Sequence, residues 1–423
     1  MSTPRAGSHG THRVPGDKSI THRALMLAAL ANGRSSIIRP LTSLDARSTA
    51  AALRATGADI SPLREGATVT VQGRGIRQTA GAILDCGNSG TTVRLLLGLL
   101  AGRPGPIRFT GDRSLRRRPM KRVTEPLGLM GARFEGDPDR LPLVMYGGPL
   151  KPLSWDSPVA SAQVKSALLL AGVSGGVPVS VREPVRSRDH TERMLASFGY
   201  QLDIRDNTVR MEPTGNVTPF EITVPGDPSS AAFLVGAALL GSRGEATIIE
   251  VGLNPTRTGF LSVLARMGAN IATSNLRTMA GEPIGDIAVK PSRLHAAAVT
   301  SEEVPSLVDE VPILACLAAR AEGESRFDGL AELRHKESDR LALLAHNLRA
   351  IGVEAAAEGD SLVVVGTDRP LRGMVRTDGD HRIAMAFSVL ARSGRIVIDD
   401  PECAAVSFPG FRAALTAIEE ECG

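Results

Sequence analysis

The sequence predicts an α/β protein that repeats one strand–helix unit six times, in two groups of three. Three observations support this prediction. A helix that ends in glycine recurs at intervals of about seventy residues, a strand leading into a capped helix recurs between these glycines, and the fourth such turn is the closest copy of the first. The chain of 423 residues is long enough for two or three domains of about 150 residues each.

The first repeated element is a helical stretch that ends in the pattern Leu-x-x-x-Gly. Helices commonly end on a left-handed residue, and glycine adopts that conformation without steric cost. The five copies are Leu53–Gly57, Leu127–Gly131, Leu195–Gly199, Leu264–Gly268 and Leu348–Gly352.

The second repeated element is a short apolar strand followed by a turn of Asp, Asn, Ser, Gly or Pro and then a helix. Such polar side chains cap helices by accepting hydrogen bonds from the first backbone N–H groups. The six copies lie at Val14–Ser19, Leu84–Ser89, Trp155–Pro158, Val224–Ser229, Val304–Ser306 and Thr377–Asp380. We expect the second group to begin near Gly226, and helix starts that point into one cleft would attract a multiply charged anion.

Composition excludes several classes of protein. Hydrophobic residues make up 42% and charged residues 22%, and no apolar run approaches the ~20 residues of a membrane span. Residues 1–13 contain no hydrophobic secretory segment. The cysteines lie too far apart for a zinc motif or a disulfide framework: Cys86, Cys316, Cys403 and Cys422. We therefore expect a cytoplasmic protein.

The charge of the chain does not favour a dedicated nucleic-acid-binding protein. The net charge is +4 over 423 residues, and only 3% of residues are aromatic. The basic run Arg116–Arg122 keeps this alternative open, because it fits a solvated loop or a nucleic-acid patch. Pro119 disfavours a helical conformation of Arg118, which we therefore expect at the end of a loop.

Groups suited to an anion stand at predicted helix starts in the first half of the chain. Ser19 and Arg23 share a helix face beside Lys18, and a lysine, a hydroxyl and an arginine together suit an oxyanion. The turn at Asn88 and Gly90 lets the backbone approach a ligand closely, although it is not a P-loop. Another apolar helix opens with small or polar residues, and a charged loop precedes the next: Ser161, Ala162, Gln163 and Arg188.

In the second half, Asp309 and Glu310 interrupt an apolar stretch, which is costly unless the carboxylates are paired or used. Charged residues also crowd two later helix starts: Lys336, Glu337, Arg340, Asp380 and Arg382. On a helix, Lys336 and Arg340 would share one face.

These segments resemble, in this order, the 5-enolpyruvylshikimate-3-phosphate synthase family. The matching stretches are PGDKSITHR, GNSGTTVR, RRPM, SAQVKSALLLAG, RDHTERML, VPGDPSSAAF, NPTRTG, DEVPILA, KESDR, DHRIAM and SFPGF. The resemblance implies a two-domain inside-out α/β barrel of six βαβαββ repeats, three per domain, with the active site in the interdomain cleft. The expected domains are 13–225 and 1–12 plus 226–423.

The resemblance also implies a reaction: the enolpyruvyl group of phosphoenolpyruvate moves to the 5-hydroxyl of shikimate 3-phosphate, and phosphate is released, on the route to aromatic amino acids. The residues matching the shikimate 3-phosphate site are Lys18, Ser19, Arg23, Ser161, Ala162, Gln163, Arg188, Asp309 and Lys336. Those matching the phosphoenolpyruvate site are Lys18, Asn88, Gly90, Arg118, Gln163, Arg340 and Arg382.

The expected catalytic residues are Asp309, Glu337 and Lys18. Asp309 is the natural base for the 5-hydroxyl, and Glu337 with Lys18 would serve the methylene carbon and bridging oxygen of phosphoenolpyruvate. Which group moves which proton stays open, because these groups would titrate together. We expect no cofactor and no metal ion, since several cations already neutralise the phosphates.

Two positions bear on the inhibitor glyphosate. Many members carry a lysine where this chain has Val406, so one phosphoenolpyruvate contact is absent or replaced. That change, with SAQVKSA and RDHTE, resembles a branch known for tolerant members. Gly90, however, is typical of sensitive members, and tolerant ones often carry alanine there. The sequence leaves sensitivity open.

The nearest alternative is the sister enolpyruvyl transferase that acts on UDP-N-acetylglucosamine. That enzyme normally carries a reactive cysteine near the position of Gly111–Arg122, where this chain has none. A basic nucleic-acid-binding protein is the alternative from another class, and binding that weakens steeply with salt would support it. The expected partners are the two small-molecule substrates, without nucleic acid or membrane, and we expect a monomer.

Overall fold

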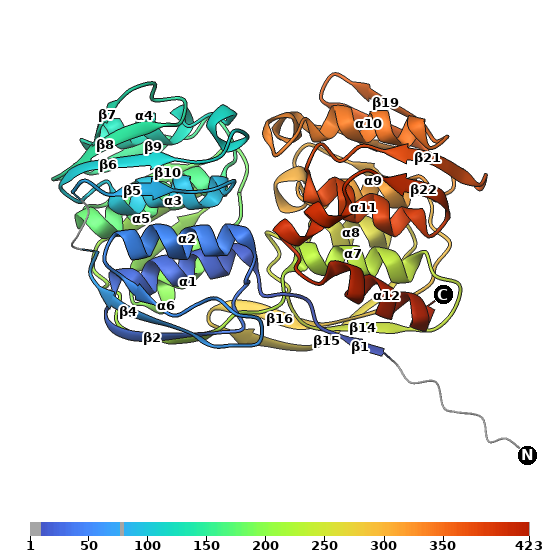
Figure 1. The fold of residues 1–423 in the computed structure, drawn as a ribbon, viewed down its shortest axis with the longest axis horizontal. Helices are drawn as coiled ribbons and strands as arrows, with labels where there is room; N and C mark the ends of the chain where they lie inside the picture. The colour runs from blue at the N-terminus through green and yellow to red at the C-terminus, as the bar shows by residue number, and fades with distance from the viewer. Residues whose placement is uncertain (1–9, 77–79, 423) are drawn as a thin grey trace, which may run out of the picture. The chain divides into compact units, whose positions relative to one another are not determined.

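The computed structural model describes residues 10–76 and 80–422, which group into two compact units (Figure 1). The 16–224 unit comprises Gly16–Val224 and Met279–Glu282. The described part of the 225–423 unit comprises residues 10–15, Pro225–Thr278 and residues 283–422. The domains expected from the sequence, 13–225 and 1–12 plus 226–423, remain a prediction. Residues 1–9 of the second expected domain lie outside the described part of the chain.

Among its described residues, the 16–224 unit has three four-stranded mixed sheets with one shared strand order. In each sheet one parallel pair is extended by an antiparallel hairpin. The first sheet has the order β13 (Glu221–Thr223), β2 (Asn32–Ile38), β4 (Val69–Arg74), β3 (Asp59–Ile60). The second has the order β5 (Ile83–Asp85), β6 (Gly105–Thr110), β8 (Leu143–Gly147), β7 (Arg133–Glu135). The third has the order β9 (Leu153–Asp156), β10 (Val179–Arg182), β12 (Thr208–Glu212), β11 (Gln201–Arg205).

The 225–423 unit repeats this plan, and its last sheet is shorter. Its first sheet has the order β1 (Gly10–His12), β14 (Ala246–Gly252), β16 (Glu282–Lys290), β15 (Asn270–Met279). The second has the order β17 (Ala298–Val299), β18 (Glu324–Phe327), β20 (Ser361–Val365), β19 (Glu354–Glu358). The third pairs only β21 (Leu371–Val375) with β22 (Gly394–Ile398) among the described residues, because the chain continues into a helix where the other repeats form a hairpin.

Two helices accompany each sheet, and a few short 3-10 helices connect them. In the 16–224 unit they are α1 (Lys18–Leu30), α2 (Leu44–Ala55), α3 (Gly90–Leu100), η1 (Leu115–Arg117), α4 (Lys121–Met130), α5 (Ala162–Gly175) and α6 (His190–Ser197). In the 225–423 unit they are α7 (Pro228–Leu239), α8 (Gly259–Arg266), η2 (Val304–Ser306), α9 (Val311–Ala318), η3 (Ala331–His335), α10 (Arg340–Ala350), α11 (His381–Ala391), η4 (Pro401–Val406) and α12 (Phe411–Cys422).

The core of each unit is built around three buried helices. In the 16–224 unit α3 packs against both α1 and α5, and in the 225–423 unit α7, α9 and α11 pack against one another. These helices are apolar on nearly every side, as expected of helices without a solvent face. Gly98 permits the close approach of α3 to α5, because a Cβ there would lie 2.0 Å from the carbonyl oxygen of Ala167 in α5.

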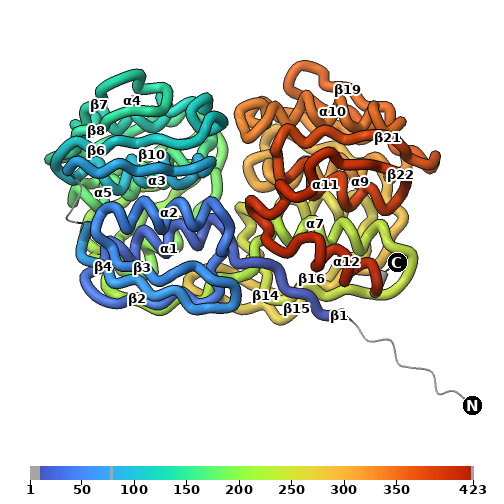
Figure 2. The backbone as a smooth tube through the Cα atoms, viewed as in Figure 1, coloured from blue at the N-terminus to red at the C-terminus, as the bar shows by residue number. Residues whose placement is uncertain are grey.

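The first sheet of each unit borrows a strand from a distant part of the chain. β13 pairs in parallel with β2. β1 pairs in parallel with β14, and these two segments lie side by side in Figure 2. Each borrowed strand occupies the place that β5, β9 or β17 fills from within its own repeat. The pairing of β1 with β14 explains why the start of the chain belongs to the 225–423 unit, whereas β13 and β2 both lie within Gly16–Val224.

The predicted helix punctuation is largely confirmed. All five pattern glycines have positive φ and follow the ends of α2, α4, α6, α8 and α10: Gly57, Gly131, Gly199, Gly268 and Gly352. Asp17, Ser89, Asp227 and Asp380 cap α1, α3, α7 and α11 through their side chains.

Two predicted caps were wrong. At the third copy the cap is Ser161, because the residues before Pro158 form strand β9. At the fifth copy residues 304–306 form η2, and α9 begins only at Val311 without a side-chain cap.

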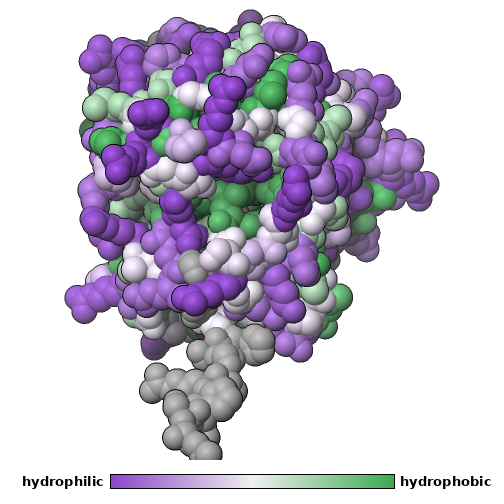
Figure 3. Space-filling model, turned by 90° about the vertical axis from the view of Figure 1, so that its right-hand side faces the viewer, coloured by the Kyte–Doolittle hydropathy of each residue, from purple (hydrophilic) through white to green (hydrophobic). Residues whose placement is uncertain are grey.

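The molecular surface is mainly polar on the face that Figure 3 shows, with a smaller hydrophobic area near its centre. Within the described ranges, no helix is long and apolar enough to cross a membrane.

Candidate functional site

The start of α1 holds three of the predicted anion-binding residues. Asp17 accepts a hydrogen bond from the backbone N–H of Ile20 at 2.8 Å and so fixes the first turn. Lys18 is the first helical residue and forms an ion pair with the buried Asp45 of α2. Arg23 donates to the carbonyl oxygen of Ser19 at 2.9 Å, which confirms that these two residues share a helix face.

The start of α3 brings together Asn88, Gly90 and Arg118. Asn88 is held between two neighbours: its amide nitrogen donates to Asp112 at 2.6 Å, and its amide oxygen accepts from Arg118 at 2.6 Å. Arg118 follows η1 in an extended conformation, as the Pro119 rule predicted. A Cβ at Gly90 would lie 3.3 Å from Nη1 of Arg118, so glycine leaves the space beside this guanidinium free.

Arg94 links this region to the start of α5. Its Nη1 donates to Oε1 of Gln163 at 2.5 Å, and its Nη2 donates to the carbonyl oxygen of Pro119 at 3.0 Å. Gln163 in turn donates to Thr91 at 3.1 Å. Arg94 was not among the residues predicted from the sequence, although an arginine in an apolar helix is itself a signal of a polar partner.

The remaining predicted residues of this unit lie at the starts of α5 and α6. Ser161 caps α5, and Ala162 is its first residue. The backbone N–H of Ser161 donates to Oε1 of the buried Glu183 at 3.0 Å. Arg188 lies half-buried in the loop before α6. Burial is the main cause that lowers the pKa of Arg23, and the nearby charge of Arg188 adds to it.

A chain of buried hydroxyl groups runs behind the starts of α1 and α3. Nδ1 of His22 contacts Oγ1 of Thr49 at 2.6 Å, Thr49 contacts Oγ1 of Thr92 at 2.6 Å, and Thr92 contacts Ser89 at 2.7 Å. Burial lowers the pKa of His22 to about 3, so the imidazole is neutral at physiological pH. The chain ties the α3 cap to α1 and α2.

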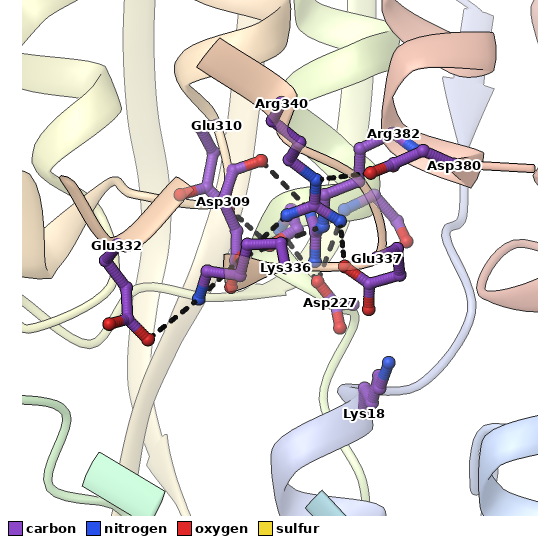
Figure 4. A network of polar contacts seen from close by, with 12 residues as sticks. Lys18, Asp227, Asp309, Glu310, Glu332, Lys336, Glu337, Arg340, Asp380 and Arg382 are labelled. Carbon is purple, nitrogen blue, oxygen red and sulfur yellow. Dashed lines mark hydrogen bonds and ion pairs between the residues drawn. The ribbon is translucent and has the colours of Figure 1, made fainter. Parts of the chain in front are cut away.

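In the 225–423 unit, Asp309 lies among four cationic side chains (Figure 4). Its carboxylate oxygens lie 3.5 Å from Nη1 of Arg340, 3.8 Å from Nε of Arg382, 3.9 Å from Nζ of Lys336 and 3.9 Å from Nη1 of Arg257. The carboxylate in the apolar stretch is therefore paired, as its burial required.

Arg340 is the centre of this cluster and is buried. Its Nε donates to Oδ2 of Asp380 at 2.8 Å, and its Nη2 donates to Glu337. Although burial opposes the charge, Asp380, Glu337 and Asp309 raise the pKa of Arg340 above its ordinary value. Burial likewise disfavours the ionised form of Asp380, but the charge of Arg340 holds its pKa below the ordinary value.

The helix predicted around Lys336 begins later than expected. α10 begins at Arg340, where the Asp339 side chain accepts from the backbone N–H of Ala342 at 3.0 Å. Lys336 has an extended backbone and reaches Asp309 and Glu332 from the segment that follows η3. Glu337 still lies beside Arg340, at three residues' separation.

The buried Arg257 lies beside Asp309 and was not assigned from the sequence. Arg257 donates to Ser229 at 2.8 Å and lies 3.9 Å from Glu310, and Ser229 donates to Glu310. The motif NPTRTG contained Arg257, but its partners stand 28 and more residues away in sequence. These contacts hold the guanidinium of Arg257 in place near Asp309.

Each unit therefore presents cations and helix N-termini suited to phosphate and carboxylate groups. The 16–224 unit brings together Asn88, Gly90, Arg118 and Gln163, and separately joins Ser19 to Arg23. The 225–423 unit brings together Asp309, Lys336, Glu337, Arg340 and Arg382.

Comparison with known proteins gives one consistent family. The sequence matches the family described as EPSP synthase (3-phosphoshikimate 1-carboxyvinyltransferase) over residues 3–415. A 3-phosphoshikimate 1-carboxyvinyltransferase from Thermus thermophilus is 50% identical over 407 residues, covering 95% of this chain and 94% of the relative. One from Desulforudis audaxviator is 46% identical over 425 residues, covering 99% of each chain.

Solved structures agree. EPSP synthase from Acinetobacter baumannii superposes with a TM-score of 0.84 at 39% identity, covering 98% of this chain and 97% of that one. The enolpyruvyl transferase NikO from Streptomyces tendae, at 17% identity, has a TM-score of 0.76 over 97% and 96% of the two chains and shares the fold.

Proposed function

The chain belongs to the EPSP synthase family and transfers the enolpyruvyl group of phosphoenolpyruvate to shikimate 3-phosphate, and we propose the roles that its own residues take in this reaction. Its fold is the two-domain inside-out α/β fold of this family. One observation carries the proposed roles: Asp309 is the acidic centre of a cluster of four cations.

We assign Asp309 as the base for the 5-hydroxyl of shikimate 3-phosphate. In the first step this hydroxyl loses its proton to the carboxylate while its oxygen attacks C2 of phosphoenolpyruvate, and the methylene carbon C3 gains a proton. In the second step C3 loses a proton, the C2–O bond to phosphate breaks, and the enol ether and phosphate leave. Glu337 and Lys18 are the groups that act on the two other reacting positions, the proton at C3 and the bridging oxygen of phosphoenolpyruvate.

Two sets of residues bind the substrates in this proposal. Shikimate 3-phosphate is held by Lys18, Ser19, Arg23, Ser161, Ala162, Gln163, Arg188, Asp309 and Lys336. Phosphoenolpyruvate is held by Lys18, Asn88, Gly90, Arg118, Gln163, Arg340 and Arg382. The fixed guanidinium of Arg118 on Asn88 and that of Arg340 on Asp380 support this assignment, because a pre-oriented arginine loses little entropy when it binds an anion.

The alternatives from sequence analysis are not favoured. A relative at 50% identity carries the shikimate enzyme's name, not that of the UDP-amino-sugar enzyme. The basic run is partly engaged within the protein, since Arg118 binds Asn88 and Arg116 donates to Thr110 at 3.0 Å. We further propose a cytoplasmic monomer that does not bind nucleic acid, which light scattering and a salt series of binding to duplex DNA would test.

Phosphate release is the direct test of the function. Purified protein should release phosphate only when both substrates are present, and mass spectrometry should find the enolpyruvyl ether of shikimate 3-phosphate. A parallel reaction with UDP-N-acetylglucosamine as acceptor should release none. Phosphate release with the sugar nucleotide but not with shikimate 3-phosphate would overturn the assignment.

A further inference from the structure

Lys165 carries a charge deep inside the 16–224 unit. Its side chain is 1% exposed, and its Nζ lies 2.9 Å from Oε2 of Glu183 and 2.8 Å from Oε1 of Glu192. Burial opposes the lysine charge, but Glu192 and Glu183 together raise the pKa of Lys165 above its ordinary value. The ammonium group also donates to the carbonyl oxygen of Ser187 at 3.3 Å. The group is therefore a buried, fully engaged cation.

Arg23 supplies a second buried cation in the same region. Burial lowers its pKa to about 10, and the charge of Glu192 offsets part of that effect, so Arg23 stays ionised at neutral pH. Its guanidinium donates to Thr191 at 2.6 Å and to Ser166 at 2.6 Å. Two buried cations, Lys165 and Arg23, thus accompany two buried carboxylates, Glu183 and Glu192, and their formal charges cancel.

Glu183 joins two segments that are separate in sequence. Its Oε1 accepts from the backbone N–H of Ser161 at 3.0 Å. Its Oε2 accepts from the backbone N–H of Ser187 at 3.2 Å and from the Ser187 hydroxyl at 2.8 Å. The cap of α5 and the residue before Arg188 are therefore fixed by the two oxygens of one carboxylate.

Stability alone does not account for such an arrangement. A buried ion pair contributes little net stability, because the desolvation of its charges offsets their attraction, and apolar residues of the same volume often serve as well. What apolar residues cannot do is accept the backbone and hydroxyl hydrogen bonds that hold Ser161 and Ser187 at fixed positions.

We propose that Glu183, held in place by Lys165, is a positioning residue that sets Ser161 and Arg188 for the phosphate ester of shikimate 3-phosphate. Glu183 does not touch the substrate. It acts through the N-cap of α5 on one side and through Ser187 on the other. The proposal rests on the proposed function of this chain, since it names the phosphate-bearing substrate as the ligand of these two segments.

Two variants separate this role from general destabilisation. In Glu183→Gln the amide oxygen can still accept from Ser161, but the amide nitrogen faces the Ser187 donors and Lys165 loses one carboxylate. In Ser187→Ala only the hydroxyl contact to Glu183 is lost. The control is Glu135→Gln, because Glu135 is exposed and accepts only a surface hydrogen bond from Tyr146.

The expected result is a change confined to one substrate. The KM and Kd for shikimate 3-phosphate should rise about tenfold in Glu183→Gln and about threefold in Ser187→Ala, within the range expected for the net loss of one ordinary hydrogen bond. The KM for phosphoenolpyruvate and kcat at saturating shikimate 3-phosphate should stay within about twofold of wild type, and Glu135→Gln should resemble wild type in all four values.

Each other outcome is decisive. If both variants fold and bind shikimate 3-phosphate with the wild-type Kd, the positioning role of Glu183 is overturned, while the proposed function of the chain still stands. Parallel losses for both substrates with a lowered unfolding midpoint would show a merely structural role. Calorimetric binding of shikimate 3-phosphate that weakens in the variants, while wild type releases no phosphate, would support the positioning role and overturn the proposed reaction.

Discussion

Nε of Arg340 donates to Oδ2 of Asp380 at 2.8 Å, and the two side chains are only 1% and 0% exposed. Oδ1 of Asp380 accepts from the backbone N–H of Arg382 at 2.9 Å, so one buried carboxylate fixes the capped start of α11 and the guanidinium of Arg340. Two of the proposed phosphoenolpyruvate ligands, Arg340 and Arg382, therefore depend on an aspartate that lies behind them.

Asp380→Asn should destabilise the protein strongly. The substitution keeps the shape of the side chain but removes a negative charge that compensates the buried guanidinium of Arg340. Breaking a buried ion pair costs about 3–5 kcal/mol. Denaturant unfolding followed by circular dichroism measures the loss. The matched control is Asp378→Asn, which removes the exposed pair with Arg376 and should cost less than about 1 kcal/mol. Equal losses in the two variants would contradict the anchoring role of Asp380.

Asp309→Ala and Asp309→Asn should both lower kcat by about 10²–10⁴-fold, because a positioned base contributes that much to a proton transfer. The KM values should not rise in proportion, since both variants leave the surrounding cations more available to anionic substrates. Steady-state phosphate release measures both constants. Glu322→Gln, at an exposed ion pair with Arg293 in the same unit, is the control and should keep wild-type rates. Wild-type turnover in Asp309→Asn would exclude this residue as the base.

The buried imidazole of His22 should make stability depend on pH. In the folded protein burial lowers its pKa to about 3, whereas the unfolded chain takes up the proton below about pH 6.5. Between these values the unfolded state binds more protons, so the free energy of unfolding falls as the pH falls, by up to about 1.4 kcal/mol per pH unit from this group.

His22→Gln should remove that contribution. Urea unfolding at pH 7 and pH 5 would measure it, and the difference between the two pH values should be smaller for the variant than for wild type. His346→Gln, at an exposed histidine of α10, should leave the difference unchanged. An identical pH difference in wild type and His22→Gln would contradict a lowered pKa of His22 in the folded state.

Much of the fold was predictable because its signals are local. The glycines at 57, 131, 199, 268 and 352 and the caps Asp17, Ser89, Asp227 and Asp380 each satisfy backbone groups within one or two turns of the chain. The wrong caps have local reasons too. Trp155 belongs to strand β9, and the turn at Val304 forms a 3-10 helix, which the capping pattern does not distinguish.

The supporting residues of the site were not predictable in the same way. Glu183 is linked to Ser161 across 22 residues, Arg257 to Ser229 across 28, and Arg340 to Asp380 across 40. Such pairs form only when the repeats pack together, and no spacing rule along the chain reports them. Buried charge in an apolar segment identified Asp309, and charged helix starts identified Lys336, Arg340 and Arg382, but neither signal showed that these side chains meet.

Gly90→Ala tests how the inhibitor glyphosate is excluded. Gly90 is the first residue of α3 and has no positive φ, so alanine fits its backbone without strain. A Cβ there would lie 3.1 Å from Nη1 of Arg94 and 3.3 Å from Nη1 of Arg118, so both guanidinium ends must shift by a few tenths of an ångström. The space beside Arg118 therefore shrinks while its charge remains.

Glyphosate resembles phosphoenolpyruvate in charge but is longer, so the lost space should affect it more than the substrate. Val406 removes a cation that both ligands would share, whereas the open space beside Gly90 separates them, so we expect a wild-type enzyme of high or intermediate sensitivity. Gly90→Ala should raise the inhibition constant for glyphosate at least about tenfold and the KM for phosphoenolpyruvate about threefold or less, in line with about 1–3 kcal/mol for overpacking. Gly128→Ala, whose Cβ meets open space on α4, should change neither constant. The measurement is steady-state inhibition of wild type, Gly90→Ala and Gly128→Ala by glyphosate. A wild-type enzyme that millimolar glyphosate does not inhibit would contradict this prediction, because the space beside Gly90 would then not govern binding of the inhibitor.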